Sequence, residues 1–132
     1  MEEEMANILV CDDEKDIVTA LRIYLQAEGY QIYEAFNGEE AIEVMKRQEI
    51  HLVLMDIMMP VMDGYQALMG IRNLEKERNI PKEKEAKIIM TTALNDEGNV
   101  KMAFELGCTV YSGKPIDQER FEQVLKKFGL IE

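Results

Sequence analysis

Acidic, hydroxyl and ammonium side chains stand at the ends of short apolar segments in this 132-residue sequence. Asp12 and Asp13 follow the first apolar segment, and Asp56 ends the third. Thr92 follows the fourth segment and Lys114 follows the fifth. The carboxyl ends of parallel strands meet at one edge of a sheet, so these five residues are candidates for a common site.

Such a set of side chains is suited to phosphoryl chemistry. Three carboxylates at one site repel one another unless a positive charge lies between them, and carboxylates with water suit Mg²⁺. A carboxylate can also attack phosphorus and become an aspartyl phosphate. The transfer depends mainly on positioning the reacting groups and on balancing the negative charge of the phosphoryl oxygens. Mg²⁺ could hold one of these oxygens, Lys114 a second and the Thr92 hydroxyl a third.

Each of these residues also has an ordinary structural explanation. An acidic pair after a strand often serves only the N-terminus of a helix. Asp63 is expected to be such an N-cap, and a lone Thr or Lys at a strand end is usually structural or solvated. The combination of all five candidates at the ends of four segments is what favours a functional site.

Five apolar segments alternate with five segments of helical character. Strands are predicted at residues 7–11, 31–35, 52–55, 86–91 and 109–112. The apolar stripes of the helices are Ile17, Val18, Leu21 and Leu25; Ala41, Ile42 and Met45; Tyr65, Leu68, Ile71 and Leu74; Val100, Ala103 and Phe104; and Phe121, Val124, Leu125 and Phe128. Helix boundaries are predicted at Gly29 and Gly107 as C-terminal stops and at Asn37, with Glu40, as an N-cap.

Strict alternation of strands and helices predicts an α/β fold with a doubly wound five-stranded parallel sheet, (βα)5. In the order 2-1-3-4-5, which is flavodoxin-like, the first and third strands are neighbours at the switch point where ligands bind. The charged stretch 75–85, which contains Pro81, is expected to be a solvated extension of the third helix followed by a long loop.

Composition narrows the classes of function. The chain is long enough for one domain, and 47% hydrophobic residues are ordinary for a globular protein. Its formal net charge of -11 argues against binding to nucleic acid and to anionic membranes. No signal peptide or membrane-spanning segment is evident, so a cytoplasmic location is expected. Cys11 and Cys108 are expected to be buried and unpaired.

In these residues the sequence resembles the receiver domains of bacterial two-component response regulators, which have the CheY-like fold. The resemblance covers roughly residues 7–128 and implies a receiver domain at 5–128 with no output domain after it. It is carried by Asp12-Asp13, the run Asp56-Ile57-Met58-Met59-Pro60-Val61-Met62-Asp63-Gly64, Thr92-Ala93 and Lys114-Pro115.

The resemblance implies that Asp56 is the phosphoacceptor. It implies that Asp13, Asp56 and the main-chain carbonyl of Met58 bind Mg²⁺ directly, and that Asp12 acts through metal-bound water.

It further implies that Thr92 and Lys114 contact the phosphoryl group and that Tyr111 is a rotating switch residue. The peptide before Pro115 is expected to be cis. By the same resemblance, Met58 and Leu94 stand where the family varies to tune hydrolysis of the acyl phosphate, and because both are apolar we expect slow self-dephosphorylation.

The resemblance implies a phosphorylation-activated switch rather than an enzyme, with a histidine kinase or phosphotransfer protein as donor. The single histidine, His51, lies roughly 16 Å from Asp56 if the strand between them rises about 3.3 Å per residue, so it is no internal donor. The expected readout is the surface of the fourth helix, fifth strand and fifth helix. An intermediate phosphorelay carrier, a Mg²⁺-dependent aspartyl phosphatase, a docking module without switching and a flavin-binding protein are the alternatives.

Overall fold

The computed structural model describes residues 6–92, 97–113, 118–127 and 129. Strands and helices alternate along the chain, as predicted. Their order is β1 (Asn7–Cys11), α1 (Lys15–Ala27), β2 (Gln31–Ala35), α2 (Gly38–Arg47), β3 (Leu52–Asp56), α3 (Gly64–Glu77), the short 3₁₀ helix η1 (Lys82–Lys84), β4 (Lys87–Thr92), α4 (Glu97–Glu105), β5 (Val110–Gly113) and α5 (Gln118–Lys127).

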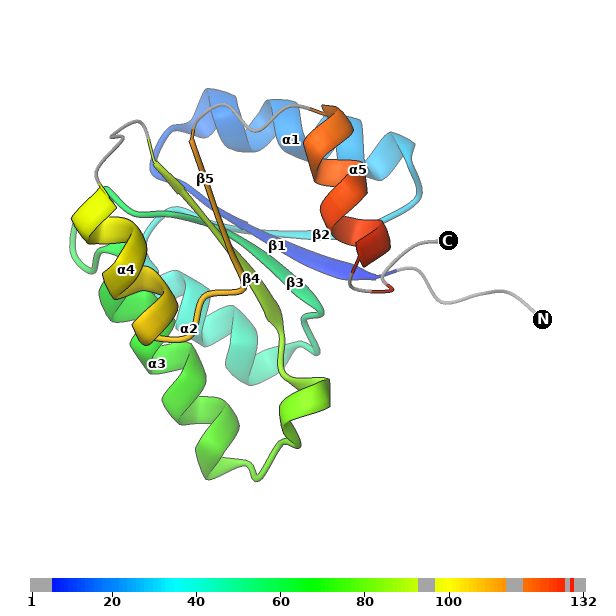
Figure 1. Cartoon of the computed structure of the whole chain (residues 1–132). Helices are drawn as coiled ribbons and strands as arrows, with labels where there is room; N and C mark the ends of the chain where they lie inside the picture. The colour runs from blue at the N-terminus through cyan, green and yellow to red at the C-terminus, as the bar shows by residue number, and fades with distance from the viewer. Residues whose placement is uncertain (1–5, 93–96, 114–117, 128, 130–132) are drawn as a thin grey trace.

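All strand pairs are parallel, and the strand order is β2-β1-β3-β4-β5 (Figure 1). The predicted fold class and strand order are therefore confirmed. The chain leaves β1 toward β2 on one side and returns to β3 on the other. The switch point consequently lies between the carboxyl ends of β1 and β3.

Helices cover both faces of the sheet, with α1 and α5 on one face and α2, α3 and α4 on the other (Figure 1). The strands alternate strictly between the two cores, as a period of two residues requires. Leu9, Val53 and Met90 belong to the core beneath α2, α3 and α4. Ile8 and Leu54 belong to the core beneath α1 and α5. The three central strands are buried on both sides, which explains their nearly continuous apolar sequence.

Local signals in the sequence set several helix boundaries as predicted. The Asn37 side chain accepts a hydrogen bond from the Glu40 backbone amide at 2.9 Å, while the Glu40 carboxylate accepts one from the Phe36 amide at 2.8 Å. Asp63 is the N-cap of α3 and forms a capping box with Gln66. These caps satisfy amides that helix starts leave unpaired.

The ends of three strands differ from the prediction by one residue. The third strand runs to Asp56, the fourth from Lys87 to Thr92 and the fifth from Val110 to Gly113. Thr92 is paired in register with Gly113, so it belongs to the sheet instead of following it. The pairing with a neighbouring strand, which single-strand patterns do not contain, decides where each strand ends.

Two expected burial patterns are wrong. Phe104, placed in the buried stripe of its helix, is 49% exposed; among the side chains of that helix that the structure describes, Ala103 is the one that is buried in the core. Glu75, placed in a solvated stretch, is 3% exposed. The Glu75 carboxylate accepts hydrogen bonds from Arg72 at 2.7 Å and from the Ala86 amide at 2.7 Å, which offset its burial.

The remainder of the charged stretch is solvated as expected, apart from the partly buried Ile80 and Glu85. The last predicted apolar position, Phe128, lies outside the described residues. Within the described part of the chain, no helix has the length and apolar character needed to cross a membrane.

Candidate functional site

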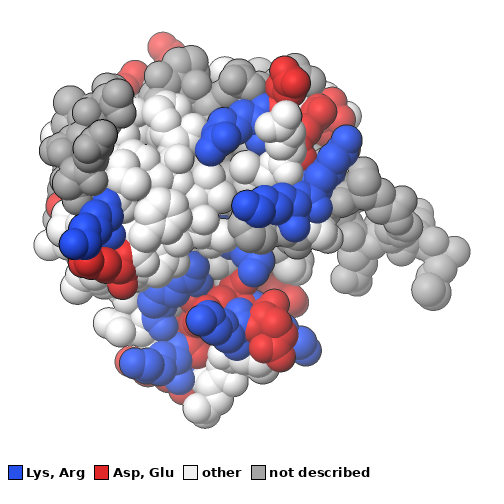
Figure 2. Space-filling model, viewed as in Figure 1, with Lys and Arg blue, Asp and Glu red and all other residues white. Residues whose placement is uncertain are grey.

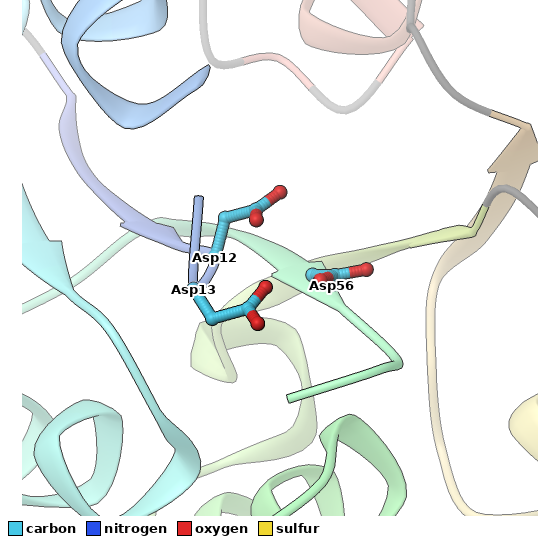
Figure 3. A group of neighbouring side chains, drawn as sticks. All are labelled: Asp12, Asp13 and Asp56. Carbon is cyan, nitrogen blue, oxygen red and sulfur yellow. The ribbon is translucent and has the colours of Figure 1, made fainter. Parts of the chain in front are cut away.

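The acidic candidates meet at the carboxyl end of the sheet. Cys11 and Met55 are partners in the register between β1 and β3, so the residues that follow them, Asp12 and Asp56, lie next to each other. Asp13 is one residue farther along the same connection. Figure 3 shows the three carboxylates side by side at the ends of these two strands.

The three side chains are close enough to share one cation. One carboxylate oxygen from each of Asp12, Asp13 and Asp56 can be chosen so that all three lie within 4.8 Å of one another. Asp12 and Asp56 are each 3% exposed, whereas Asp13 is exposed to solvent. Asp12 is further fixed by a 2.9 Å hydrogen bond from the Glu14 amide to its Oδ1.

This donor set fits Mg²⁺. Carboxylate oxygens are hard ligands, and Mg²⁺ is usually held by a few carboxylates together with several waters. Two buried carboxylates this close together favour a cation between them. The exposed position of Asp13 leaves one side of the site open to water and to a substrate.

The connection between β3 and α3 forms the wall of the site and contains a strained turn. The Met62 amide donates to the Pro60 carbonyl at 2.7 Å, which closes a three-residue turn with Val61 at its centre. Val61 has φ 69°, a conformation that a β-branched residue rarely adopts. Met58, in the same connection, is 62% exposed. Backbone strain of this kind is often found at functional sites.

Gly64 is required by the close approach of α3 to the backbone of Asp56. The Gly64 amide donates to the Ile57 carbonyl at 2.9 Å. A Cβ atom on Gly64 would overlap the Asp56 carbonyl oxygen and lie 2.8 Å from the Ile57 Cα. A Cβ on Gly38 would lie 2.7 Å from the side chain of Met62. The two glycines therefore let α3 and the connection pack tightly beneath Asp56.

Sequence reasoning identified Gly64 only as part of a turn and did not single out Gly38. The Asp63-Gly64 pair was a visible signal, but it indicated a turn and not a close backbone approach. Gly38, at the first position of α2, carried no signal that separates it from an ordinary helix start.

Thr92 and Tyr111 lie on neighbouring strands. Thr92 is 3% exposed at the end of β4. Tyr111 is paired in register with Met90, two residues before Thr92, so Tyr111 and Thr92 face the same side of the sheet. The Tyr111 hydroxyl is buried and has no hydrogen-bond partner among the described residues. Lys114, Pro115 and Leu94 lie outside the described residues, so their predicted roles remain predictions.

Cys11 lies beneath the acidic cluster and is buried, as predicted. Its thiol contacts the Asn37 carbonyl at 3.4 Å and the Met59 sulfur at 3.4 Å. Burial, followed by the negative charges of Asp12 and Asp56, raises the pKa of the Cys11 thiol far above its ordinary value. The thiol is therefore a neutral part of the core and not a nucleophile.

His51 lies at the opposite end of the sheet from Asp56, as predicted. Its Nδ1 accepts a 2.9 Å hydrogen bond from the Asn7 amide at the start of β1. Its backbone amide donates to the Asn7 carbonyl at 2.9 Å. These contacts hold His51 at the amino-terminal end of the parallel strands, whereas the acidic cluster lies at their carboxyl end.

Comparison with known proteins identifies a family for the chain. Residues 8–126 match the response regulator receiver domain family. A probable transcriptional regulator, ycf27 of Porphyridium aerugineum, is 39% identical over 115 residues, which are 87% of this chain and 44% of that protein. The chain spans less than half the length of the curated relatives that it matches.

Two solved structures have the same fold. The receiver domain of Ssk1 from Saccharomyces cerevisiae, crystallised with the histidine phosphotransfer protein Ypd1, is 26% identical with a TM-score of 0.86, and the match covers 98% of this chain and 92% of that chain. The CheX–CheY complex of Borrelia burgdorferi, crystallised with beryllofluoride and Mg²⁺, is 33% identical with a TM-score of 0.80 and covers 93% of this chain and 89% of that chain.

Proposed function

Because the chain belongs to the response regulator receiver family of two-component systems, we propose that Asp56 is its phosphoacceptor. In the proposed reaction, the Asp56 carboxylate attacks the phosphorus of a phosphohistidine on a partner protein. A P–O bond to Asp56 forms while the P–N bond of the donor breaks. The imidazole leaves with its electron pair and takes up a proton from water.

The observation that carries this proposal is the convergence of Asp12, Asp13 and Asp56 within 4.8 Å at the switch point of the sheet. We propose that Asp13, Asp56 and the main-chain carbonyl of Met58 hold Mg²⁺ directly and that Asp12 does so through water. Bound Mg²⁺ would supply positive charge that favours the approach of the phosphoryl oxygens to the carboxylates.

The chain's other residues have positioning roles in this proposal. The hydroxyl of Thr92 donates a hydrogen bond to a phosphoryl oxygen, and the ammonium group of Lys114 pairs with another. Tyr111 then changes its rotamer and alters the surface formed by α4, β5 and α5. The strained turn at Val61 and the close packing of Gly64 hold the Asp56 backbone in place during the transfer.

We further propose that the receiver unit spans residues 5–128, acts in the cytoplasm and has no catalytic activity beyond its own phosphorylation and dephosphorylation. The donor is a histidine kinase or a phosphotransfer protein, consistent with the Ypd1 complex of the similar Ssk1 domain.

Incubation with Mg²⁺ and acetyl phosphate tests the proposal without a partner protein. We expect intact mass spectrometry to show one added phosphoryl group, and peptide mapping after borohydride reduction to locate it on Asp56. Asp56→Asn and chelation of Mg²⁺ should abolish the label. Asp16→Asn, which changes an exposed carboxylate in the first turn of α1, is the matched control and should leave the label unchanged.

Other outcomes separate the alternatives. Labelling on another residue, or a label that survives Asp56→Asn, would contradict the proposal. Steady release of inorganic phosphate from a small phosphomonoester, with no label retained, would instead favour an aspartyl phosphatase.

We also expect the phosphorylated form to lose its phosphoryl group slowly. The Met58 side chain is apolar and 62% exposed, so it offers no group that orients an attacking water. Decay of the label after removal of acetyl phosphate, followed by mass spectrometry, should take minutes or longer. Met58→Asn supplies a polar side chain at this position and should shorten the decay. A lifetime of seconds for the unaltered protein would contradict the expectation.

A further inference from the structure

A groove of about 410 Å³ lies at the end of the fold opposite the acidic cluster. It lies between the C-terminal ends of α2 and α3 and the charged stretch 75–85. Ile50 and Ala86, which come just before β3 and β4, also line it. The groove is therefore at the amino-terminal ends of the strands, whereas Asp12, Asp13 and Asp56 lie at the carboxyl ends.

The charged stretch is held in place at both of its ends. After α3, the Asn79 amide donates to the Lys76 carbonyl at 3.1 Å and the Ile80 amide donates to the Glu75 carbonyl at 3.0 Å. With Asn79 at φ 54°, these two bonds form a Schellman motif. At the other end, the Glu75 carboxylate accepts a 2.7 Å hydrogen bond from the Ala86 amide. The stretch is thus a formed wall of the groove.

The groove contains apolar side chains that folding leaves partly open to solvent. Leu74 and Ile80 are half-buried and Pro81 is exposed. Ile80 directly follows Asn79, so the Schellman motif fixes its position on the wall. An apolar hollow with fixed walls is suited to hold an apolar side chain of a partner.

The rim of the groove carries more cations than carboxylates, although the protein has a net charge of -11. Its cationic side chains come from α2, from the end of α3 and from η1, and are those of Lys46, Arg47, Arg78 and Lys84. Two carboxylates line the groove, those of Glu49 and Glu75. Glu75 is buried and lies 2.7 Å from Arg72, so its charge is already balanced within the fold.

The other carboxylates of the charged stretch do not line the groove. Charged side chains of both signs gather over η1 and the adjoining end of α3 (Figure 2). Glu77 and Glu83 are exposed and lie outside the groove, and Glu85 lines a separate hollow beside Arg72. The positive rim is therefore a local feature of the groove and not of the whole stretch.

The contacts of the rim cations leave their charge largely unbalanced. Lys46 and Arg47 lie 3.6 Å and 3.7 Å from the Glu43 carboxylate, in exposed pairs of a kind that contributes little. Arg78 donates to main-chain carbonyls at the end of α2, which are neutral groups. Among the described residues, Lys84 has no ion pair. The end of α2 offsets only roughly half a charge.

We propose that this groove binds an acidic segment of a partner protein, with one apolar side chain of that segment packed against Leu74 and Ile80 and its carboxylates beside Arg78 and Lys84. Charge complementarity selects this occupant, because the rim would repel a basic segment. An anionic membrane is disfavoured, since it would approach a protein whose net charge is -11. Because the groove is formed before binding, little ordering of this chain is required.

The position of the groove separates it from the proposed phosphorylation site. β3 lies between Ile50, which lines the groove, and the carboxylate of Asp56 at the other end of the strand. We therefore expect the acidic segment to bind equally well whether or not Asp56 is phosphorylated. The groove would hold the protein beside a partner in both states, which is a role beyond the proposed function.

A phage-displayed library of random peptides is the probe for this inference. Peptides are selected on the full, untreated chain, and those that bind Ile80→Ser equally well are removed. We expect the remaining sequences to be enriched in Asp and Glu together with apolar residues. An enrichment in Lys and Arg, the lack of a charge preference, or a library with no peptide left would overturn the inference.

Two variants of η1 then test the charge of the rim with a selected peptide in solution. Lys84→Gln should weaken binding by about fivefold to tenfold, and added salt should weaken binding to the unaltered chain because it screens the charges. Lys82→Gln is the matched control, because Lys82 is an exposed residue of the same 3₁₀ helix that lines the separate hollow and not the groove. Equal affinities of the two variants would contradict the inference.

Further measurements distinguish other occupants. Binding to vesicles that contain phosphatidylglycerol, if Lys84→Gln abolishes it, would make a membrane the occupant and overturn the inference. A dimer in sedimentation that Lys84→Gln disrupts would make a second copy the occupant, with the same consequence.

Treatment with Mg²⁺ and acetyl phosphate separates this inference from the proposed function. The selected peptide should bind equally well before and after treatment, and binding that needs the label on Asp56 would contradict the inference. If Asp56 is not labelled, the proposed function fails while the peptide result stands. If Asp56 is labelled but no acidic peptide is retained, the inference fails and the proposed function stands.

Discussion

Gly64 links the geometry of a single residue to the position of the reacting carboxylate. A side chain at this position would meet the backbone of Asp56 and Ile57, which belongs to β3 and its connection and has little freedom to move. Forcing extra atoms into such a contact typically costs about 1–3 kcal/mol of stability. The displacement would act on the residue that carries the chemistry.

We predict that Gly64→Ala lowers stability by about 1–3 kcal/mol and reduces labelling of Asp56 by acetyl phosphate. Urea unfolding measures the first effect and mass spectrometry the second. Gly113→Ala is the control, because the one atom of the described residues that a Cβ there would approach is the Thr92 carbonyl oxygen, at 4.0 Å. Equal behaviour of the two variants would show that the approach of α3 to Asp56 is not tight.

Cys108 makes stability depend on alkaline pH. Burial raises the pKa of the Cys108 thiol to about 11 from an ordinary value of 9.0, and the opposing charge of Arg72 only reduces the shift. Between these values the unfolded chain loses the thiol proton while the folded chain keeps it. Stability from this group is therefore complete below pH 9 and is lost as pH rises toward about 11.

We therefore predict that the stability of the unaltered chain depends more strongly on alkaline pH than the stability of Cys108→Ala. The free energy of unfolding should fall more between about pH 8 and about pH 10 for the unaltered chain than for Cys108→Ala, since both share every other titrating group. Urea titrations at the two pH values measure this. A fall of the same size in both proteins would contradict the assignment.

At the scale of elements, Arg72 ties α3 to two other parts of the fold. Its guanidinium donates to the Gly107 carbonyl at 2.7 Å, to the Ala86 carbonyl at 2.9 Å and to the Glu75 carboxylate at 2.7 Å. Glu75 in turn accepts from the Ala86 amide. One buried ion pair thus joins the end of α3, the start of β4 and the turn after α4.

We predict that Arg72→Met costs about 3–5 kcal/mol in urea unfolding, because it leaves the carboxylate of Glu75 buried without its cation. Lys46→Met removes one partner of the exposed Lys46–Glu43 pair and should cost only about 0–1 kcal/mol. The account is contradicted if the two variants are equally stable. A double variant, Arg72→Met with Glu75→Leu, should recover part of the loss.

The helices and strands were predictable from the sequence, but the burial of some of their side chains was not. Alternating strands and helices follow from apolar periodicity, so the α/β class with a parallel sheet was predictable. The strand order 2-1-3-4-5 was assumed from known folds of this class, and the structure confirms it. The burial of Glu75 was not, because its partner Ala86 lies eleven residues away, beyond a proline. Phe104 shared a helical stripe with Ala103, but periodicity along one helix does not reveal how that helix lies against β5, the last strand in the sheet order.

The acidic part of the site was predictable for a related reason. In a parallel sheet all strands end at the same edge, so residues after β1 and β3 must meet once the strand order is known. The placement of Thr92 within β4 was missed, because the register with Gly113 depends on a neighbouring strand. Gly64 was missed as a packing residue, because close backbone approach leaves no pattern in a single sequence.

At the scale of the whole molecule, the parallel sheet brings distant parts of the sequence to one edge. Asp12 and Asp56 are 44 residues apart in the chain, yet both are buried beside each other at the switch point. On a protein with a net charge of -11, this edge concentrates negative charge where a cation can bind. Two layers of helices hold the edge fixed while its outer face stays open.

A crystal structure of the protein with Mg²⁺ and beryllofluoride tests this account most directly, because beryllofluoride mimics an acyl phosphate without decaying. The account predicts a cation in contact with Asp13, Asp56 and the Met58 carbonyl, and beryllofluoride on a carboxylate oxygen of Asp56. Crystals of Asp56→Asn under the same conditions should lack the beryllofluoride. A structure of the unaltered protein with neither species at this edge, or with the three carboxylates turned to separate places, would contradict it.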